Sequence, residues 1–290
     1  MASSPPPLPP SEQGRGLEPE YLSPETSFDP APPPVRKPKP SWAYAPATYL
    51  LVGINCLVFL LMTVRGVNPM SPTAEQLLYF GADHAGAVLI GGQWWRIVTA
   101  MFVHVGILHL ATNMWCLWNL GLLAEPLMGS TGLLEVYILT GAGGNLLSTF
   151  VNWVWPFRDT LGNVAYPVGA GASGAVFGIA GALIILLKSH RLPVPPLELH
   201  KLRRSVIYFA AINLVIGFSI SFGTMVAHSG LQIDNMAHLG GCGCGLLFAA
   251  PMEPRIGTPK PLFLFRRRVA TVMVVGILVL FGFYLAQLPR

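Results

Sequence analysis

The stretch GILHLATNMWCLWNLGLLAEPLM, residues 106–128, decides the fold class, because it is long and apolar enough to cross a membrane. About 20 such residues in a helix span the hydrocarbon core of a bilayer. His109 and Asn113 stand near its start, four residues apart and therefore on one helix face. Polar side chains inside a membrane are costly and usually face the interior of a helix bundle. The stretch therefore predicts a membrane protein with a polar layer in its interior.

Further apolar segments on both sides predict seven membrane-spanning helices. With the first, they are residues 47–64, 106–128, 133–155, 172–188, 205–226, 235–252 and 269–288. The composition agrees, because 52% of the 290 residues are hydrophobic and 11% are charged, whereas a soluble domain carries roughly a quarter charged residues. We expect an all-α polytopic membrane protein, and a soluble enzyme is excluded.

Four regions follow one another along the chain. We expect a disordered, Pro-rich cytosolic tail at 1–46, a six-span core at 47–252, a basic cytosolic linker at 253–268 and a seventh transmembrane helix at 269–290. The tail holds 14 of the 27 prolines and no long apolar run, which is typical of a segment that cannot form a packed core. It is either a protein-binding segment or a spacer.

The loop charges set the orientation of the spans. Of the 18 Lys and Arg residues, 14 precede the first span or lie between spans 4 and 5 or spans 6 and 7. The positive-inside rule therefore places the N-terminus in the cytosol and the C-terminus outside. Because these cations sit in separate loops and form no basic face, nucleic acid is not an expected partner. The first external loop, 65–105, is amphipathic and is expected to lie in the membrane interface.

This orientation brings polar residues from three distant segments to one depth beneath the outer membrane face. They are His109 and Asn113, Ser173, and His238. A serine and a histidine at matched depth suit nucleophilic acyl transfer, because the imidazole can take the hydroxyl proton as the oxygen attacks. We expect Ser173 as nucleophile and His238 as general base. They form a dyad, because Asp234, the nearest acid, lies one helical turn farther out, near water.

Small residues at every fourth position would let the two helices of this dyad approach closely. One row is Gly174, Gly178 and Ala182, and the other is Ala237, Gly241 and Gly245. Each row lies one position from Ser173 or His238, so close contact would place both side chains beside one seam. Phe177, four residues after Ser173, is expected to pack against the imidazole of His238.

Acyl transfer also requires hydrogen-bond donors near the oxygen that becomes negative. His109 and Asn113 share one helix face at the depth of Ser173, and the Ser173 amide lies near the positive end of its own helix. These three groups are the expected oxyanion hole.

The same residues also permit other uses. Metal binding by His104, His109 and His238 is the weaker hypothesis, because no carboxylate or cysteine stands at that depth in a ligand spacing, and we expect neither metal nor cofactor. A proton or ion transporter would also use membrane histidines, but the spans contain no chain of acidic residues. A lone intramembrane serine usually bonds back to its own helix, and we expect this of Ser148.

Three motifs resemble those of the rhomboid family of intramembrane serine proteases. They are HxxxxHxxxN at residues 104–113, GxSG at residues 171–174 and AHxxGxxxG at residues 237–245. The pair Trp95-Arg96 is similar to the family's WR pair in the first external loop, and Glu125 with Gly129 to its acid and glycine at the cytosolic end of span 2. The resemblance covers about residues 47–252.

The resemblance implies the same dyad and oxyanion hole. It also implies a structural role for His104 near the active site, a supporting role for Gly171 in the nucleophile motif, and stabilisation of the first external loop by Trp95 and Arg96. Phe177 departs from the family, since many members carry tyrosine at this position. Stacking on His238 does not need the hydroxyl, so we keep its role.

The resemblance further implies single-pass membrane proteins as substrates, cleaved near the outer face where their helix unwinds. Substrates would enter from the surrounding membrane lipid past the fifth span, with Phe222 and Met225 as a gate. A bacterial inner membrane is the expected location, with a eukaryotic secretory membrane as the alternative; the oligomeric state stays open. A relative that binds membrane clients without cleaving them is the second hypothesis, and the intact Ser173 and His238 weigh against it.

Overall fold

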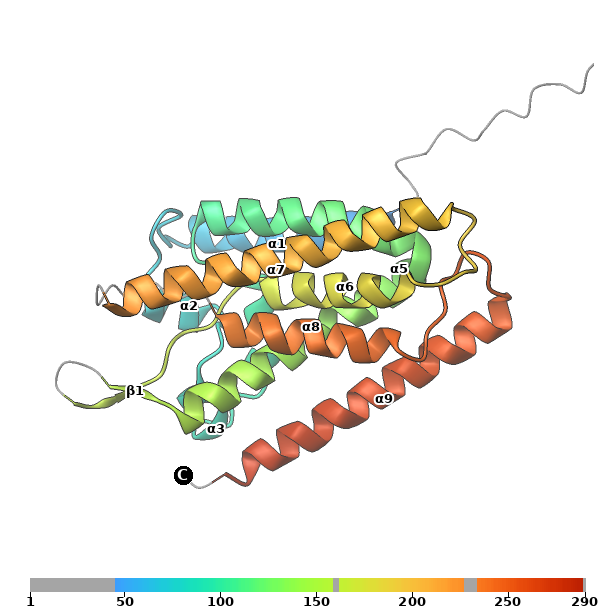
Figure 1. Ribbon diagram of the computed structural model, residues 1–290. Helices are drawn as coiled ribbons and strands as arrows, with labels where there is room; N and C mark the ends of the chain where they lie inside the picture. Colours follow the sequence, from blue (N-terminus) through green and yellow to red (C-terminus); the bar gives the residue numbers. More distant parts are fainter. Residues whose placement is uncertain (1–44, 159–161, 227–233, 289–290) are drawn as a thin grey trace, which may run out of the picture. The chain divides into compact units, whose positions relative to one another are not determined.

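The computed structural model describes residues 45–158, 162–226 and 234–288, and these residues are mostly helical (Figure 1). The chain divides into two units, Met1–Ser41 and Trp42–Arg290, and every described residue belongs to the second. The side chains of residues 157–158 and 218–226 are not described. The predicted gate residues Phe222 and Met225 therefore lie outside the described side chains.

Within the described residues, six longer helices form the bundle, and shorter elements lie in the loops between them. The longer helices are α1 (Pro46–Val64), α5 (Ile107–Val154), α6 (Ser173–Leu186), α7 (Pro196–Val226), α8 (Asn235–Ala249) and α9 (Lys260–Ala286). The first external loop contains α2 (Ala74–Tyr79), α3 (Ala85–Leu89), α4 (Arg96–Thr99) and the 3-10 helix η2 (Ala100–Phe102). Strands β1 (Phe157–Arg158) and β2 (Val164–Ala165) pair antiparallel, with Phe157 opposite Ala165. The sequence did not predict this small hairpin.

Helix α5 consists of two helices joined at Gly129. This residue has φ 73° and ψ 160°, a non-helical conformation that glycine adopts without steric cost. The two halves occupy the ranges predicted as separate spans at 106–128 and 133–155. By length and composition α1, α5 and α9 can cross a membrane, and α6 is a shorter apolar helix.

Helices α7 and α9 begin earlier than the sequence predicted. They start at Pro196 and Lys260, whereas the predicted starts were residues 205 and 269. A hydropathy pattern ends at the first charged residues, but backbone hydrogen bonding continues past them. Proline also suits the first position of a helix, where its missing N–H costs nothing. The last part of the predicted 253–268 linker is therefore helical.

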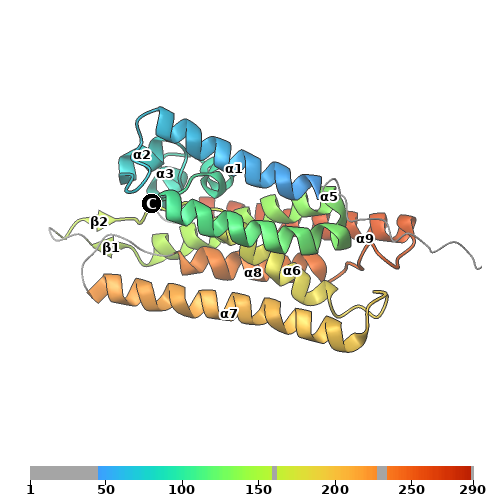
Figure 2. The ribbon, with the colours of Figure 1, turned by 90° about the horizontal axis from the view of Figure 1, so that it is seen from above.

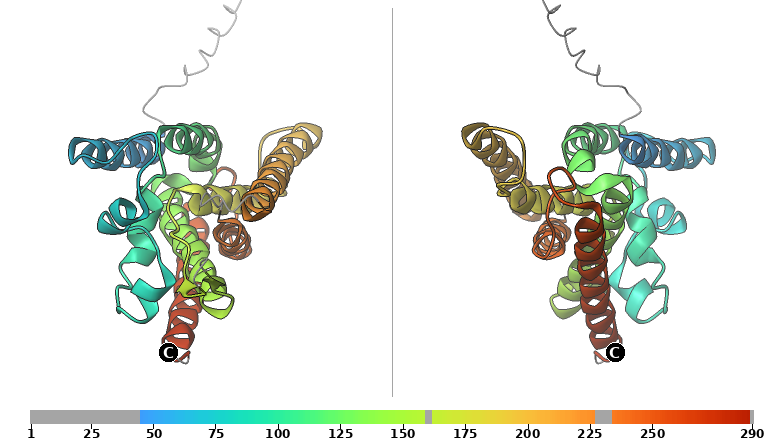
Figure 3. Two further views of the ribbon diagram at one scale, coloured as in Figure 1. Left: turned by 90° about the vertical axis from the view of Figure 1, so that its left-hand side faces the viewer. Right: turned by 90° about the vertical axis from the view of Figure 1, so that its right-hand side faces the viewer.

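Helix α6 forms the centre of the bundle. Eleven of its fourteen residues are buried, which is typical of a helix enclosed on all sides. It packs between α5 and α8, while α1 lies beside α5 and α7 lies at the opposite edge (Figures 2 and 3). The first residue of α6 is Ser173, so the most enclosed helix carries the predicted nucleophile.

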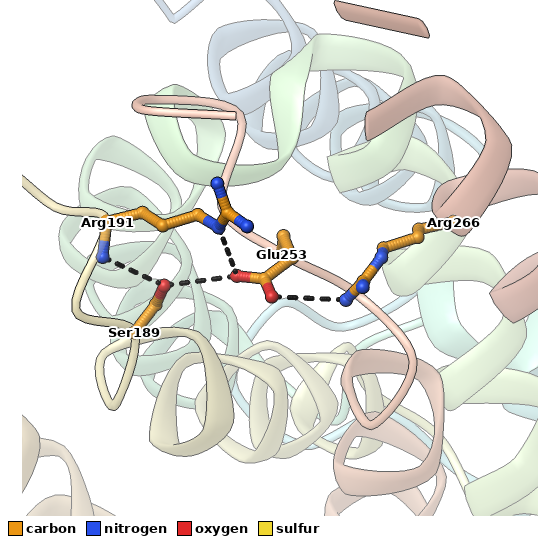
Figure 4. A network of polar contacts seen from close by, with 4 residues as sticks. All are labelled: Ser189, Arg191, Glu253 and Arg266. Atoms are coloured by element: carbon orange, nitrogen blue, oxygen red, sulfur yellow. Dashed lines mark hydrogen bonds and ion pairs between the residues drawn. The ribbon is translucent and has the colours of Figure 1, made fainter. Parts of the chain in front are cut away.

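A polar network joins the ends of α6 and α8 to α9 (Figure 4). The carboxylate of Glu253, just after α8, lies 3.5 Å from Arg191 Nε and 3.1 Å from Nη1 of Arg266 on α9. The hydroxyl of Ser189, just after α6, donates to the same carboxylate at 3.2 Å and accepts from the Arg191 N–H at 3.3 Å. One carboxylate thus ties three helices together at the end opposite Ser173.

Candidate active site

The backbone before Ser173 is held in a conformation that requires glycine. Gly171 has φ +132°, and its N–H donates to the Ala100 carbonyl at 3.0 Å. A Cβ at this position would lie 2.6 Å from Cε1 and 3.0 Å from Nε2 of the His109 ring. Because Ser173 is the first residue of α6, its own amide N–H has no partner within the helix.

His104 holds the backbone before Ser173 through a hydrogen bond. Its side chain is fully buried, and Nε2 accepts a hydrogen bond from the Ala172 N–H at 3.4 Å. Nδ1 lies 3.3 Å from the Phe102 carbonyl, so this nitrogen carries the proton. The residue next to Ser173 is therefore tied to the segment that precedes α5, in agreement with a structural role for His104.

His109 presents a donor to the segment before Ser173. The Val105 N–H donates to its Nδ1 at 3.3 Å, which assigns the proton to Nε2. This nitrogen faces Gly171, as the approach of its ring to that residue shows. The described geometry thus directs this N–H at the segment before Ser173.

Asn113 is buried one turn farther along α5, and its described contact is with its own helix. One Nδ2 hydrogen is donated to the His109 carbonyl at 2.9 Å. The amide retains a second N–H, because an asparagine side chain has two. The structure thus brings His109 to the Ser173 segment, whereas Asn113 makes no described hydrogen bond to Ser173.

His238 is held by an aromatic ring. Phe177 stacks on it with ring centroids 4.4 Å apart and planes 9° from parallel, as the spacing from Ser173 predicts. His238 is 7% exposed, and within the described residues its Nδ1 has no hydrogen-bond partner. The imidazole is therefore oriented by packing, without a carboxylate at its second nitrogen.

The predicted glycine seam between α6 and α8 is present. A Cβ on Gly241 would overlap the carbonyl oxygen of Gly174, and a Cβ on Gly245 would overlap that of Gly178. Bare backbone thus meets bare backbone at two successive turns. Only glycine allows this approach.

The seam places the immediate neighbours of the serine and the histidine in contact. A Cβ on Gly174 would lie 3.3 Å from the carbonyl oxygen of Ala237 and 3.8 Å from its Cβ. Ser173 and His238 adjoin these two residues in sequence. No hydrogen bond joins the two side chains in the part of the chain that the structure describes. Such bonds are often long in unliganded enzymes and tighten when substrate binds.

Arg96 organises the first external loop. Its side chain is 8% exposed, and Nη1 donates to the carbonyls of Leu78 at 2.7 Å and Ala82 at 2.9 Å. Its guanidinium also lies 4.6 Å from the ring centroid of Trp95, which is itself exposed. The WR pair thus joins α4 to the end of α2 and leaves an indole on the surface.

Glu125 acts away from the dyad, at the start of α1. This carboxylate is 1% exposed and accepts the N–H groups of Ala47 at 3.0 Å and Thr48 at 2.9 Å. It also accepts the hydroxyls of Thr48 at 2.7 Å and Ser130 at 2.6 Å. A negative charge is favourable at a helix N-terminus, so Glu125 fastens α1 to both halves of α5.

The prediction that Ser148 bonds back to its own helix is wrong, and Asp234, predicted to lie near water, is partly exposed but also accepts hydrogen bonds from within the protein. The Ser148 hydroxyl donates to Asp234 Oδ2 at 2.5 Å, across 86 residues of sequence. The other oxygen of Asp234 accepts the Ala237 N–H at 2.9 Å and so caps α8. An aspartate just before a helix start is a strong N-cap signal, and that signal could have revealed the inward direction of Asp234.

Sequence reasoning also missed Asp83, which is 2% exposed in the first external loop. The Thr149 hydroxyl donates to both of its carboxylate oxygens, at 3.2 and 2.9 Å. No local pattern marks this residue, because its partner lies 66 positions away. Across the described ranges, no three His, Cys, Asp or Glu residues are placed to hold a metal ion.

Comparison with known proteins gives a consistent assignment. The Rhomboid domain family matches residues 91–255, which contain all three motifs and the WR pair. Rhomboid protease GluP of Bacillus subtilis (strain 168) is 32% identical over 237 residues, 82% of this chain and 40% of that protein. Rhomboid protease AarA of Providencia stuartii is 30% identical over 213 residues, 70% of each chain. RHOMBOID-like protein 6, mitochondrial, of Arabidopsis thaliana is 31% identical over 193 residues, 66% of this chain and 54% of that protein.

The region shared with the Bacillus protein spans less than half of that relative, and the region shared with the Providencia protein spans most of it. The apolar helices and the family match make the chain an integral membrane protein. Because the family match covers more than half of its length, the chain belongs to the rhomboid family.

Proposed function

We propose that the chain is a serine endopeptidase that cleaves transmembrane segments of single-pass membrane proteins with a dyad of Ser173 and His238. One observation carries this proposal: the contact of Gly174 with Ala237, the sequence neighbours of Ser173 and His238, supports a placement of the serine beside the histidine. The stacking of Phe177 on His238 adds a fixed ring orientation. General-base catalysis needs both proximity and orientation.

The reaction follows from these positions. His238 takes the proton from the Ser173 hydroxyl as Oγ attacks the scissile carbonyl carbon, and the carbonyl oxygen becomes negative. The Nε2–H of His109, the second amide N–H of Asn113 and the backbone N–H of Ser173 stabilise that oxygen. His238 then gives its proton to the leaving amine, and water hydrolyses the acyl-enzyme in a second cycle of the same kind.

The proposed topology has six core spans and one further span. We assign the core to α1, the two halves of α5, α6, α7 and α8, and the seventh span to α9. The N-terminus is cytosolic, the C-terminus is outside, and the dyad lies just beneath the outer face of a bacterial inner membrane. The cations at the starts of α7 and α9 support this orientation.

Substrate access is assigned to the α7 side. This helix lies at the edge of the bundle, where Phe209 approaches Phe177 with ring centroids 6.4 Å apart (Figure 2). A transmembrane substrate must unwind locally to expose a carbonyl, because a lipid-embedded helix keeps its carbonyls hydrogen-bonded. Phe222 and Met225, farther along α7, are proposed to cover the site until a substrate displaces them.

The decisive experiment compares wild type with Ser173→Ala and His238→Ala in liposomes that contain a single-pass substrate. Ser205→Ala and His190→Ala are matched controls, because both residues are exposed and lie outside the site. We expect cleavage by wild type and both controls, and none by the two dyad variants, with all five proteins showing similar melting temperatures.

Labelling of Ser173 by a fluorophosphonate tests the nucleophile without a substrate. Wild type should be labelled and both dyad variants should not. If Ser173→Ala keeps cleaving, another residue is the nucleophile. If folded wild type is neither active nor labelled, while it still captures a membrane client, the proposal gives way to client binding without cleavage.

A further inference from the structure

Two aspartates outside the proposed dyad have carboxyl groups that lie close together. Asp83, in the first external loop, forms a two-way backbone bridge with Gly169: its N–H donates to the Gly169 carbonyl at 2.7 Å, and the Gly169 N–H donates back at 2.9 Å. A Cβ at Gly169 would lie 3.1 Å from Asp234 Oδ2 and 3.8 Å from Asp83 Oδ2. The two carboxyl groups therefore flank the backbone segment that leads into Ser173.

Both carboxyl groups are anchored on the second half of α5. The hydroxyls of the adjacent residues Ser148 and Thr149 donate to Asp234 and to Asp83, respectively. Asp234 in turn caps α8, the helix that carries His238. Four segments thus converge here: the first external loop, α5, the 167–172 segment before Ser173, and the start of α8.

The two carboxyl groups have different environments. Burial raises the pKa of Asp234, while the Ser148 hydroxyl and the N–H groups at the positive end of α8 favour its ionised form. Asp83 is buried, and its carboxylate accepts the Thr149 hydroxyl and the backbone N–H of His84. Two negative charges so close together inside a protein repel strongly, so one group of such a pair keeps its proton more readily.

We propose that Asp83 and Asp234 are positioning residues for Ser173 and His238, and that Asp83 acts in its protonated form. When Asp83 is neutral, the first external loop and the 167–172 segment stay against the start of α8. Ser173 and His238 then keep their relative positions. When Asp83 loses its proton, repulsion from Asp234 separates these segments. This inference rests on the proposed protease activity.

The burial of Asp83 and the groups around it decide the pH at which it loses its proton. The pKa of Asp83 is raised to about 7, because burial and the nearby Asp234 raise it more than the Thr149 hydroxyl, the His84 backbone N–H and Arg96 lower it. His84, the next residue in the chain, has its pKa lowered by burial and by Arg96 and is neutral near pH 7. The 167–172 segment contains no titratable side chain. Asp83 therefore titrates near neutral pH.

The sign of the stability effect follows. In the unfolded chain Asp83 loses its proton near its ordinary pKa of 3.8, whereas the folded protein holds that proton up to about pH 7. The folded state binds more protons across this window, so its stability falls as the pH rises through it and levels off above it. Asparagine is neutral at every pH, so Asp83→Asn removes this dependence.

The test measures fluorophosphonate labelling of Ser173 in wild type and Asp83→Asn from about pH 5.5 to about pH 8.5. The labelling rate of Asp83→Asn is divided by that of wild type at each pH. This ratio cancels the titration of His238, which both proteins share. We expect a ratio near one at the acidic end and a rise of roughly two- to threefold through neutral pH. Glu75→Gln, which removes an exposed carboxyl from α2, should give a flat ratio. A flat ratio for Asp83→Asn would overturn the proposal.

A second pair of measurements separates positioning from simple support of the fold. Asp83→Ala and Asp234→Ala should lower kcat with little change in KM, whereas the asparagine variants should restore kcat at about pH 6. If asparagine restores nothing, or if KM rises and kcat stays, the residues do not position the dyad.

Thermal denaturation keeps the test independent of catalysis. The melting temperature of wild type should fall relative to that of Asp83→Asn as the pH rises from about 5.5 to about 8.5. If the melting temperatures of wild type and Asp83→Asn change equally with pH, the proposal is overturned, even in a preparation without catalytic activity. If wild type shows no labelling while the slopes differ, the protease assignment fails and the carboxyl pair stands as a structural element.

Discussion

Phe177 fixes the ring orientation of His238, the general base of the proposed dyad. The ring stacks on the imidazole at 4.4 Å and leaves its orientation to packing. An aromatic pair of this kind contributes about 0.5–1.5 kcal/mol beyond its buried area. We predict that Phe177→Ala lowers kcat about two- to tenfold with little change in KM.

Tyrosine at the same position should keep the stacking, so Phe177→Tyr is expected to retain most of the wild-type kcat. Steady-state cleavage of a transmembrane substrate in liposomes measures both parameters. An unchanged kcat in the alanine variant would show that something other than this ring orients His238.

Gly171 cannot carry a side chain, for two separate reasons. Its φ of +132° is strained for any other residue, and a Cβ would overlap the His109 ring. Strain of this kind costs about 1–3 kcal/mol. Gly171→Ala should therefore slow labelling of Ser173 by about tenfold or more and lower the melting temperature.

The control for Gly171 is Gly53→Ala in α1, where a Cβ would have nothing within 4 Å. This variant should behave as wild type. If Gly171→Ala labels at the wild-type rate, the Ser173 segment tolerates movement, and His109 is not held against it.

At the level of elements, the α6–α8 seam sets the distance between serine and histidine. Gly241→Ala would force the two backbones apart, because its Cβ would overlap the Gly174 carbonyl. Overpacking of this kind typically costs about 1–3 kcal/mol. We predict a lower melting temperature and a fall in kcat that is larger than any change in KM.

Gly243 lies on the same helix, and a Cβ there would have nothing within 4 Å. Gly243→Ala therefore controls for the effect of alanine on α8 itself. Thermal denaturation and cleavage rates compare the two variants directly. Equal behaviour of both would mean that α6 and α8 can separate without harm.

The sequence predicted this seam because spacing alone expresses it: small residues recur every fourth position beside Ser173 and His238. The stacking of Phe177 followed from the same helical period. The partners of Asp83 and Ser148 could not be predicted, because each hydrogen bond joins residues more than sixty positions apart. The early starts of α7 and α9 were missed because charged residues end a hydropathy signal without ending a helix.

At the level of the whole molecule, α9 is attached through partly exposed ion pairs. Besides the Glu253 network, Arg267 lies 3.4 Å from Glu135 on α5, and Thr271 donates to the same carboxylate at 3.0 Å. Ion pairs that water reaches contribute little, about 0–1 kcal/mol each, and salt screens them. Glu253→Gln should therefore lower the melting temperature slightly, and less so in high salt.

Glu198→Gln on α7 is the matched control, since its partner Lys201 is one turn away on the same helix and both side chains are exposed. This variant should leave the melting temperature unchanged. A large loss of stability in Glu253→Gln that persists in high salt would show that α9 depends on more than screened charge.

The glycine seam has one further consequence, which concerns temperature. Most catalytic contacts soften on warming because side chains gain access to more rotamers, and ordering them again costs entropy. At the contacts of Gly174 with Gly241 and of Gly178 with Gly245 there are no side-chain torsions to excite. The spacing of the dyad should then stay constant on heating, and an Arrhenius plot of the cleavage step should remain straight until the bundle itself unfolds.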